Sequence, residues 1–194
     1  MFKGYNQSAE HLKKNKELIE KYPFIKVDEA KWWNPIRKDY DIGFTWLDDL
    51  EPGWYKAFGI DLCEDLAKAI KEDGCEDTFE FLQIKEKYAS LRLYAAGYGD
   101  KTKEVLAKYE ELSKYICGHC GKPAEIITTG WYYPLCHKCF DDYEINSGYE
   151  DIWEWYGFDS IEDVQKEIQN IKDNYKYEEY WNSVRKEIDI ESNE

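Results

Sequence analysis

Residues 117–139 read CGHCGKPAEIITTGWYYPLCHKC, and this stretch decides how the middle of the chain folds. It begins with Cys117 and Cys120 and ends with Cys136 and Cys139, so 15 residues separate two CxxC pairs. Four thiolates match the tetrahedral coordination of Zn²⁺ in structural protein sites. We therefore predict a structural zinc ion on these four cysteines, with no position left open for a catalytic water. Two disulfides or four free thiols are the alternatives, and the paired spacing in a reducing compartment favours zinc.

The residues between the pairs indicate how the chain brings them together. Gly121 supplies the permissive backbone that a knuckle turn needs. Residues 125–128 and 131–135 predict a hairpin, and the second pair precedes a predicted helix over 140–146. Knuckle, hairpin and helix together indicate a treble-clef or zinc-ribbon module over residues 116–146. We interpret His119 and His137 as loop residues near the metal rather than as ligands.

Upstream of this module, residues 1–115 predict an α+β domain with helices around a small antiparallel sheet. Cys63 falls on the apolar side of one predicted helix, which indicates a buried thiol rather than a bridge to Cys75. Hydrophobic periodicity and turn residues predict helices at 8–22, 54–73 and from Asp100 or Thr102 to about 115, strands at 78–85 and 91–95 joined by a turn at 86–90, an extended segment at 24–27, and a loop at 31–53 with one helical turn at 48–51.

Downstream, residues 147–194 predict an acidic, aromatic-rich helical extension. Ser160 and Asp163 form a capping-box pair that opens a helix from Ile161 to Tyr175. The apolar stripe changes phase near Asn174, which indicates a kink or two helices. We expect the stripe to pack on its own chain rather than form a coiled-coil seam, and a monomer or a dimer remains open.

The charge of the chain is concentrated at one end. The 194 residues contain 26 Lys+Arg and 41 Asp+Glu, a net charge of −15. Residues 141–194 hold 17 acidic and 5 basic residues, so this end alone carries −12. Aromatic residues make up 17% of the chain, and disordered acidic chains are poor in them. A folded domain with a strongly acidic extension is therefore expected.

Composition also excludes several classes of protein. No run of about 18 apolar residues is present, and the first residues lack the apolar stretch of a secretory signal. We expect a cytoplasmic protein without a membrane segment. The excess of carboxylates opposes direct binding to a nucleic-acid backbone, which requires clustered Lys and Arg.

Enzyme motifs are weak, and we predict a non-enzymatic protein. No His-Asn pair of an HNH nuclease and no His-x-Glu of a zinc deaminase accompanies the Cys pairs. The segment Gln83-Ile84-Lys85 only loosely matches a metal-nuclease pattern, and strand alternation explains it better. A hydrolytic site at the acids of residues 48–51 ranks third among the functions weighed.

Several motifs taken together resemble one family. These are KYPFIKV, LDDLEPGWYKAFGIDLCEDL, QIKEKYASLRLYAAG and KYEELSKYICGHCGKPA, in this order over about residues 15–140. The set is similar to an uncharacterised family of proteins from Firmicutes and their phages and prophages. The resemblance implies a zinc module and a phage-accessory setting, but no activity. The chain departs from the family at Ala89, where glycine is frequent, and in its acidic extension.

Two functions follow as hypotheses. The first is an accessory protein that binds and inhibits a basic host protein, such as a CRISPR effector or another nucleic-acid-binding defence nuclease. The alternative is a nucleic-acid-binding or regulatory adaptor that uses the cations and aromatics of the zinc module. For the first hypothesis the predicted contact residues are Asp141, Asp142, Glu144, Glu150, Asp151, Glu154, Glu162, Asp163 and Glu167. The alternative for these acids is a solvated helix face that keeps the protein soluble.

Overall fold

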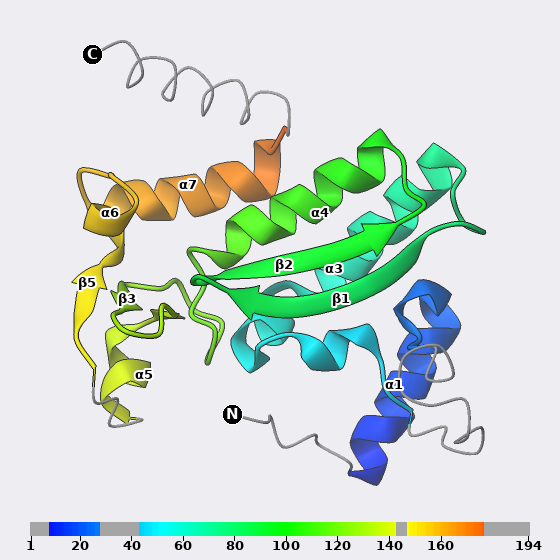
Figure 1. Cartoon of the computed structure of the whole chain (residues 1–194), viewed down its shortest axis with the longest axis horizontal. Coiled ribbons are helices and arrows are strands. Elements are labelled where there is room, and N and C mark those ends of the chain that lie inside the picture. The colour runs from blue at the N-terminus through cyan, green and yellow to red at the C-terminus, as the bar shows by residue number, and fades with distance from the viewer. Residues whose placement is uncertain (1–7, 28–42, 143–146, 177–194) are drawn as a thin grey trace.

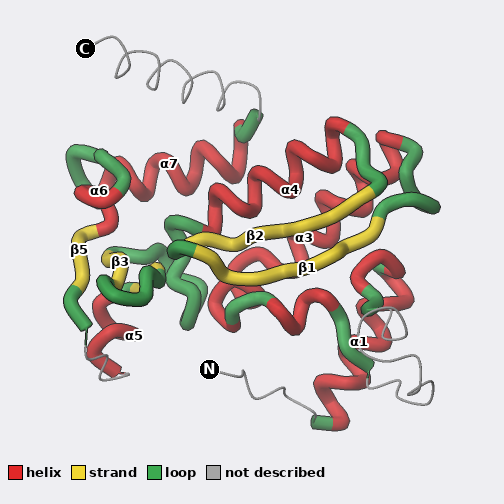
Figure 2. Tube along the Cα trace, viewed as in Figure 1, coloured by secondary structure: helices red, strands yellow, loops and turns green. Residues whose placement is uncertain are grey.

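The computed structural model describes residues 8–27, 43–142 and 147–176, and it has the predicted α+β architecture (Figure 1). A two-stranded antiparallel sheet lies against two long helices, and a smaller sheet lies at one end of the molecule (Figure 2). In chain order the elements are α1 (Ala9–Lys21), η1 (Pro23–Ile25), η2 (Trp46–Asp49), α3 (Pro52–Asp73), β1 (Glu80–Lys87), β2 (Ser90–Ala96), α4 (Asp100–Ser113), β3 (Ile126–Thr128), β4 (Pro134–Leu135), α5 (His137–Asp142), β5 (Tyr149–Asp151), α6 (Ile152–Trp155) and α7 (Ile161–Asn174).

The N-terminal segment confirms the first predicted helix and corrects the extended segment after it. Ser8 caps α1 by accepting a hydrogen bond from the backbone N–H of His11. The chain after the helix forms the 3-10 turn η1, because the fixed φ of Pro23 suits the first position of a helical turn. Lys26 is extended and forms an isolated bridge to Thr45. The prediction of a short strand or extended segment over 24–27 is therefore wrong at Phe24 and Ile25, which lie in η1.

The predicted aromatic loop is described only in part, because its residues up to 42 lie outside the described residues. In the described part, the helical turn is η2, which begins two residues before the predicted turn at 48–51. Thr45 and Asp48 form a capping box there, and this pair fixes the start of the turn.

Helix α3 is the central helix of the fold. It begins two residues earlier than predicted, because Pro52 occupies the first helical turn, where no backbone N–H is needed. It ends as predicted at Gly74, whose φ of 65° is the left-handed conformation of a helix C-cap. Its buried face carries Trp54, Phe58, Leu62, Cys63, Leu66 and Ile70.

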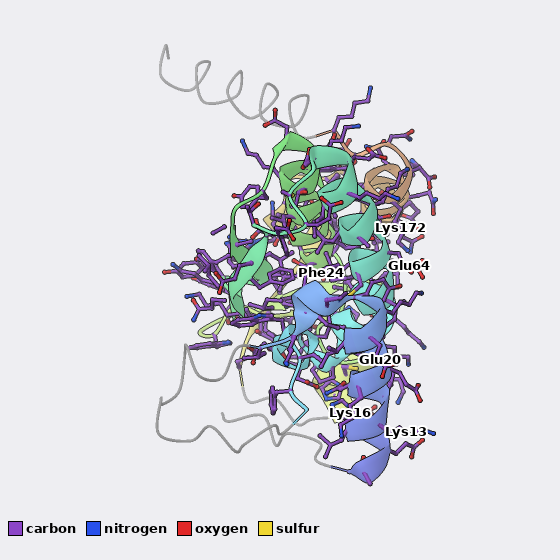
Figure 3. The ribbon with its side chains drawn as sticks, turned by 90° about the vertical axis from the view of Figure 1, so that its right-hand side faces the viewer. Lys13, Lys16, Glu20, Phe24, Glu64 and Lys172 are labelled. Atoms are coloured by element: carbon purple, nitrogen blue, oxygen red, sulfur yellow. The ribbon has the colours of Figure 1, made fainter. Side chains whose placement is uncertain are left out.

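Strands β1 and β2 form the predicted hairpin. Ile84 pairs with Leu93 on the face that packs against the core, and Lys85 pairs with Arg92 on the opposite face. The two-residue turn is Tyr88-Ala89, and both residues have positive φ. Helices α3 and α4 lie behind the hairpin in Figure 1 and to one side of it in Figure 3, so they cover one face only.

Helix α4 seals the outer edge of β2. The backbone N–H of Leu91 donates to Ser113 Oγ, and that of Leu93 donates to Glu110 Oε1. An edge strand with free N–H groups is a template for pairing with another chain, and these two side chains block that pairing.

The four-cysteine module, residues 116–146, has the predicted order of knuckle, hairpin and helix. Its hairpin pairs Ile126 with Leu135, shorter than expected. The extension adds β5 as a third strand on the other side of β3, so the sheet order is β4-β3-β5. A strand at 149–151 is not predicted by the polar sequence Tyr-Glu-Asp. The predicted helix over 140–146 begins three residues earlier, as α5.

The helices after β5 pack on the first domain. Half of the predicted capping box is present, since Ser160 Oγ accepts from the backbone N–H of Asp163 and opens α7, while the Asp163 carboxylate accepts from Ser160 Oγ rather than from its backbone. Val164, Ile168 and Ile171 are buried against the main core, so the described stripe packs on its own chain. The second half of the stripe, from Tyr177, lies outside the described residues.

Side chains from all three segments of the chain share one core. It includes residues of η1, η2, α3, β1, β2 and α4, Ile127 of the four-cysteine module, and Ile152, Val164 and Ile171 of the extension, and α1 packs against it. Neighbouring Ile126 points instead into a small second cluster around the cysteines. Alternation along one strand thus couples the two clusters. Among the described helices, none has the length and apolar composition of a membrane span.

Candidate functional site

The four predicted cysteines come together at one point. The Sγ atoms of Cys117, Cys120, Cys136 and Cys139 all lie within 4.8 Å of one another. The distance between Cys120 Sγ and Cys136 Sγ is 3.7 Å. Four sulfurs at about 2.3 Å from one ion form a tetrahedron with edges of about 3.8 Å. The observed separation therefore fits a tetrahedral site, and the four cysteines could hold a metal ion.

The first pair is held by the backbone of a tight knuckle. The N–H of Cys117 donates to the carbonyl of Lys122 at 2.8 Å, and the N–H of Gly121 donates to the carbonyl of Cys117 at 3.0 Å. Gly121 has a φ of +80°, a conformation that side chains other than glycine rarely adopt. The sequence prediction for this glycine is confirmed.

The second pair is positioned by the start of α5. Cys136 precedes the helix and Cys139 lies in its first turn, so both sulfurs face the knuckle. Glu125 Oε2 accepts a hydrogen bond from the backbone N–H of His137 at 2.8 Å and caps the helix from the position just before β3.

The thiols have different environments. Burial raises the pKa of Cys117 above its usual range. For Cys120, burial is outweighed by hydrogen bonds from the N–H of Lys122 and from the other thiols, and the net effect lowers its pKa. A bound cation would favour the thiolate at all four positions, because a coordinated thiol loses its proton.

The N-terminus of α3 supports the knuckle directly. The N–H of Gly53 donates to the carbonyl of Gly118 at 2.8 Å, and Trp54 Nε1 donates to the carbonyl of Ile116 at 3.0 Å. A Cβ on Gly53 would lie 2.7 Å from the backbone nitrogen of Gly121 and would overlap the Cys117 carbonyl oxygen. Backbone contact this close explains why glycine precedes Trp54.

The two histidines of the module are not part of the cysteine cluster. His137 is exposed, and its ring meets the Tyr149 ring edge-on with centroids 5.5 Å apart. His119 is half-buried. In the described ranges, the metal-ligand group consists of the four cysteines alone. Cys63 and Cys75 are separate buried thiols, as expected for Cys63.

The predicted partner-binding acids divide into two sets. Asp142 pairs with Lys138 at 2.7 Å, Asp163 pairs with Lys166 at 2.7 Å, and Asp151 occupies the N-cap position of α6. Glu167 accepts from Asn170 Nδ2 at 3.3 Å, and Glu144 lies outside the described residues. The exposed acids that form no salt bridge among the described residues are Asp141, Glu150, Glu154 and Glu162; of these, Glu162 interacts with the charge of Lys166.

Three of these free acids lie along one end of the molecule, on α5, β5 and α6 (Figure 1). We call Asp141, Glu150 and Glu154 the acidic edge. The β3–β4 hairpin lies beside it, because Thr128 pairs with Tyr149 and the Tyr132 ring packs on Trp155 at 5.0 Å. Trp131 at the hairpin tip is 76% exposed. The hairpin that carries this exposed indole therefore contacts β5 and α6, the elements of Glu150 and Glu154.

The acids of residues 48–51 do not form a paired-carboxylate site. Asp48 Oδ1 contacts His11 Nε2 at 2.6 Å, and its Oδ2 accepts from Asn15 Nδ2 at 2.9 Å and from Thr45 N at 2.8 Å. Glu51 is bonded elsewhere, to Tyr133. His11 and Asn15 were missed by sequence reasoning, since no motif connects α1 with residue 48 across a separation of 37 and 33 positions.

Comparison with known proteins adds no assignment. The chain matches no protein-family model, no curated protein and no solved structure. The resemblance to a Firmicutes and phage family stays a prediction from the motifs.

Proposed function

We propose that this protein is a non-enzymatic accessory protein that binds and inhibits a basic protein through the acidic edge, with the four cysteines holding a structural zinc ion. The exposed Trp131, on a hairpin that contacts the β5 and α6 elements of the acidic edge, carries the proposal. Tryptophan is enriched among the residues that dominate binding energy at interfaces, and surrounding charges select the partner and raise the association rate.

The metal has a supporting part in this proposal. A closed site of four thiolates leaves no coordination position for a substrate, so the ion would fix the hairpin that presents Trp131. The partner is a protein with a cationic groove. A nucleic-acid enzyme has such a groove, and a host defence nuclease of the CRISPR type fits the phage-accessory setting.

The alternative use of the module, as a nucleic-acid adaptor, is less well supported. Lys138 of the module pairs with Asp142 at 2.7 Å, and Lys114, just before the module, pairs with Glu111 at 2.6 Å. With these two of the three lysines at 114, 122 and 138 paired with carboxylates, the surface offers little attraction to phosphates.

The test compares two charge-reversal variants of the full chain. One variant carries Asp141→Lys, Glu150→Lys and Glu154→Lys. The control carries Glu10→Lys, Glu20→Lys and Asp77→Lys, which change three exposed acids distant in sequence from the acidic edge. The probe is a purified CRISPR effector nuclease, and the readouts are binding at two salt concentrations and inhibition of cleavage.

We expect the edge variant to lose binding and inhibition by more than about tenfold, which corresponds to 1.4 kcal/mol. Trp131→Ser should weaken both as well, and the control variant should retain them. Equal behaviour of the two charge variants, or binding that does not respond to salt, would contradict a contact through the acidic edge.

A further inference from the structure

Among the described strands, the outer face of the β1–β2 hairpin is the one basic surface that strand register defines. Register places Gln83, Lys85 and Lys87 of β1 opposite Tyr94, Arg92 and Ser90 of β2 on this face. Three of the six positions are cationic, and none carries a carboxylate. Both α3 and α4 pack on the other face, and Figure 3 shows side chains projecting from the hairpin away from these helices.

The cations on this face are placed where they repel one another. Lys85 and Arg92 are directly opposite in the ladder, and like charges at opposite positions destabilise an antiparallel pair. In the described part of the chain, neither Lys85 nor Lys87 has a carboxylate partner; their ammonium groups lie over the Tyr94 and Tyr88 rings at 5.0 and 5.2 Å. An anion bound here would remove the repulsion.

Arg92 is held in position but keeps donors available. Its Nη1 donates to Ser90 Oγ at 2.7 Å and to the carbonyl of Leu91 at 2.9 Å. Within the described residues, Nε and Nη2 make no further bond. A guanidinium fixed at one nitrogen, with its other donors open, is preorganised to contact a phosphate.

The tip of the hairpin is strained and displays an aromatic ring. Tyr88 has a φ of 52° and Ala89 a φ of 61°, although this turn favours Asn and Gly at these positions. The left-handed conformation costs about 1–2 kcal/mol for each such residue. The Tyr88 side chain is 69% exposed, so no burial offsets the strain there. Ala89 is fully buried in the core, so packing offsets its strain; strain without a packing gain remains at Tyr88, and such strain is typical of a functional position.

We propose that the outer face of the β1–β2 hairpin binds single-stranded nucleic acid, with Lys85, Lys87 and Arg92 on phosphates and with Tyr88 and Tyr94 stacking on bases. Alternating cations and exposed aromatic rings are the features that single-strand-binding surfaces combine. An acidic peptide would engage the cations, but it has no flat ring to stack on the two tyrosines.

The net charge of the chain sets the conditions under which this contact forms. Exposed charges farther apart than about 10 Å are largely screened at 0.1 M ionic strength. The described part of the acidic extension, residues 147–176, contacts α4 through α7, behind the hairpin rather than on its outer face. This part of the extension therefore leaves the basic surface open to phosphates, and binding weaker than that of a basic protein is expected.

The experiment measures fluorescence anisotropy of a labelled oligodeoxythymidine of roughly 20 nucleotides, long enough for one small binding site. The titrant is the full chain. Three phosphate contacts at about 0.7 each give a slope of about −2 for the logarithm of affinity against the logarithm of salt. Binding should therefore weaken about 20-fold between 50 and 200 mM salt.

Two variants and one control assign the contact. Lys85→Glu with Arg92→Glu should weaken binding at least tenfold, whereas Lys56→Glu with Lys68→Glu, an equal charge change on exposed positions of α3, should change it less than about twofold. Tyr88→Asn should weaken binding about fivefold and raise the melting temperature, since Asn tolerates the left-handed conformation.

The proposal is overturned by no anisotropy change at 50 mM salt, or by equal losses in the hairpin and α3 variants. Displacement of the oligonucleotide by polyglutamate as effectively as by unlabelled oligonucleotide would also overturn it, and would identify an anionic polypeptide as the occupant. If the charge variant fails to fold, Tyr88→Asn still decides the outcome. The acidic-edge variant should keep this binding, so the two proposals fail independently.

Discussion

Tyr133 Oη donates a hydrogen bond of 2.6 Å to Glu51 Oε2, and the two residues are 82 positions apart. Glu51 is the N-cap residue of α3, where a carboxylate is favoured by the helix dipole. Burial raises the pKa of Tyr133 well above its usual range, and the neighbouring Glu51 charge adds to this. The phenol therefore remains a donor at neutral pH, and the bond ties the four-cysteine module to the central helix.

Removal of this bond should destabilise the junction between module and helix. Tyr133→Phe leaves the ring in place but deprives a charged acceptor of its donor, so we expect a loss of about 1–3 kcal/mol in the free energy of unfolding. Tyr132→Phe is the matched control, because the neighbouring ring is partly exposed and its hydroxyl has no partner among the described residues. Urea denaturation measures both, and equal stabilities would contradict the junction.

Two glycines of α3 should respond in opposite directions to alanine. Gly53→Ala places a Cβ against the knuckle backbone, and overlap of this kind costs about 1–3 kcal/mol. Gly59→Ala meets only ordinary contacts of 3.4 Å or more, so the better helix propensity of alanine should make it neutral or stabilising by up to about 1 kcal/mol. Thermal unfolding of the two variants tests the contact. A Gly53→Ala protein as stable as the wild type would show that helix and knuckle are not in contact.

Metal removal should unfold the four-cysteine module. Structural zinc contributes about 10–16 kcal/mol of apparent binding free energy, which is as large as the whole stability of a typical domain. We expect about one zinc per chain by elemental analysis, and loss of the ion in Cys139→Ser. Cys75→Ala, at a buried thiol outside the cluster, should keep it. Unchanged zinc content in Cys139→Ser would rule out the four-cysteine site.

Helix α4 should lose a cap when Asp73 is removed. Asp73 is the last residue of α3. Its carboxylate accepts hydrogen bonds from the backbone N–H of Thr102 at 2.8 Å and from that of Lys101 at 3.3 Å, both in the first turn of α4. Asp73→Ala should therefore cost about 1 kcal/mol at neutral pH. Asp77→Ala, at an exposed carboxyl nearby, serves as the control.

The same cap predicts a pH dependence. Burial opposes ionisation of Asp73, but the hydrogen bonds from Thr102 and Lys101 outweigh it and lower its pKa. A carboxyl whose pKa is lower in the folded state stabilises the fold above its unfolded pKa of about 3.9, and this contribution is lost as the pH falls through the folded pKa. The stability difference between wild type and Asp73→Ala should persist at pH 7 and vanish in strong acid. A difference that grows on acidification would contradict the cap.

Local pattern was enough to predict the α+β class, the hairpin and the cysteine cluster. In each CxxC pair, at residues 117 and 136, the two cysteines are only three positions apart. Their ability to bind one metal ion can therefore be predicted from local spacing. Ser160 and Asp163 are three positions apart, and their capping box was predicted for the same reason. Such local spacings can be recognised without knowing how distant segments of the chain pack.

Contacts between segments that are distant in the sequence could be identified only from the tertiary structure. The sequence predicts Asp100 or Thr102 as the cap of α4, but Gly99 is the N-cap residue and Asp73 supplies the carboxylate. Strand β5 has no periodic pattern in three residues and exists because β3 offers it a free edge. The partners of Asp48 on α1 follow equally from packing.

The sequence by itself thus determined which elements form and which four residues could hold a metal, because those depend on neighbours along the chain. The tertiary structure alone decided that α3 braces the knuckle through Gly53 and Glu51, and that cations gather on one face of the hairpin. Strand register and helix packing bring these groups together, and both are fixed by burial of the shared core rather than by any short motif.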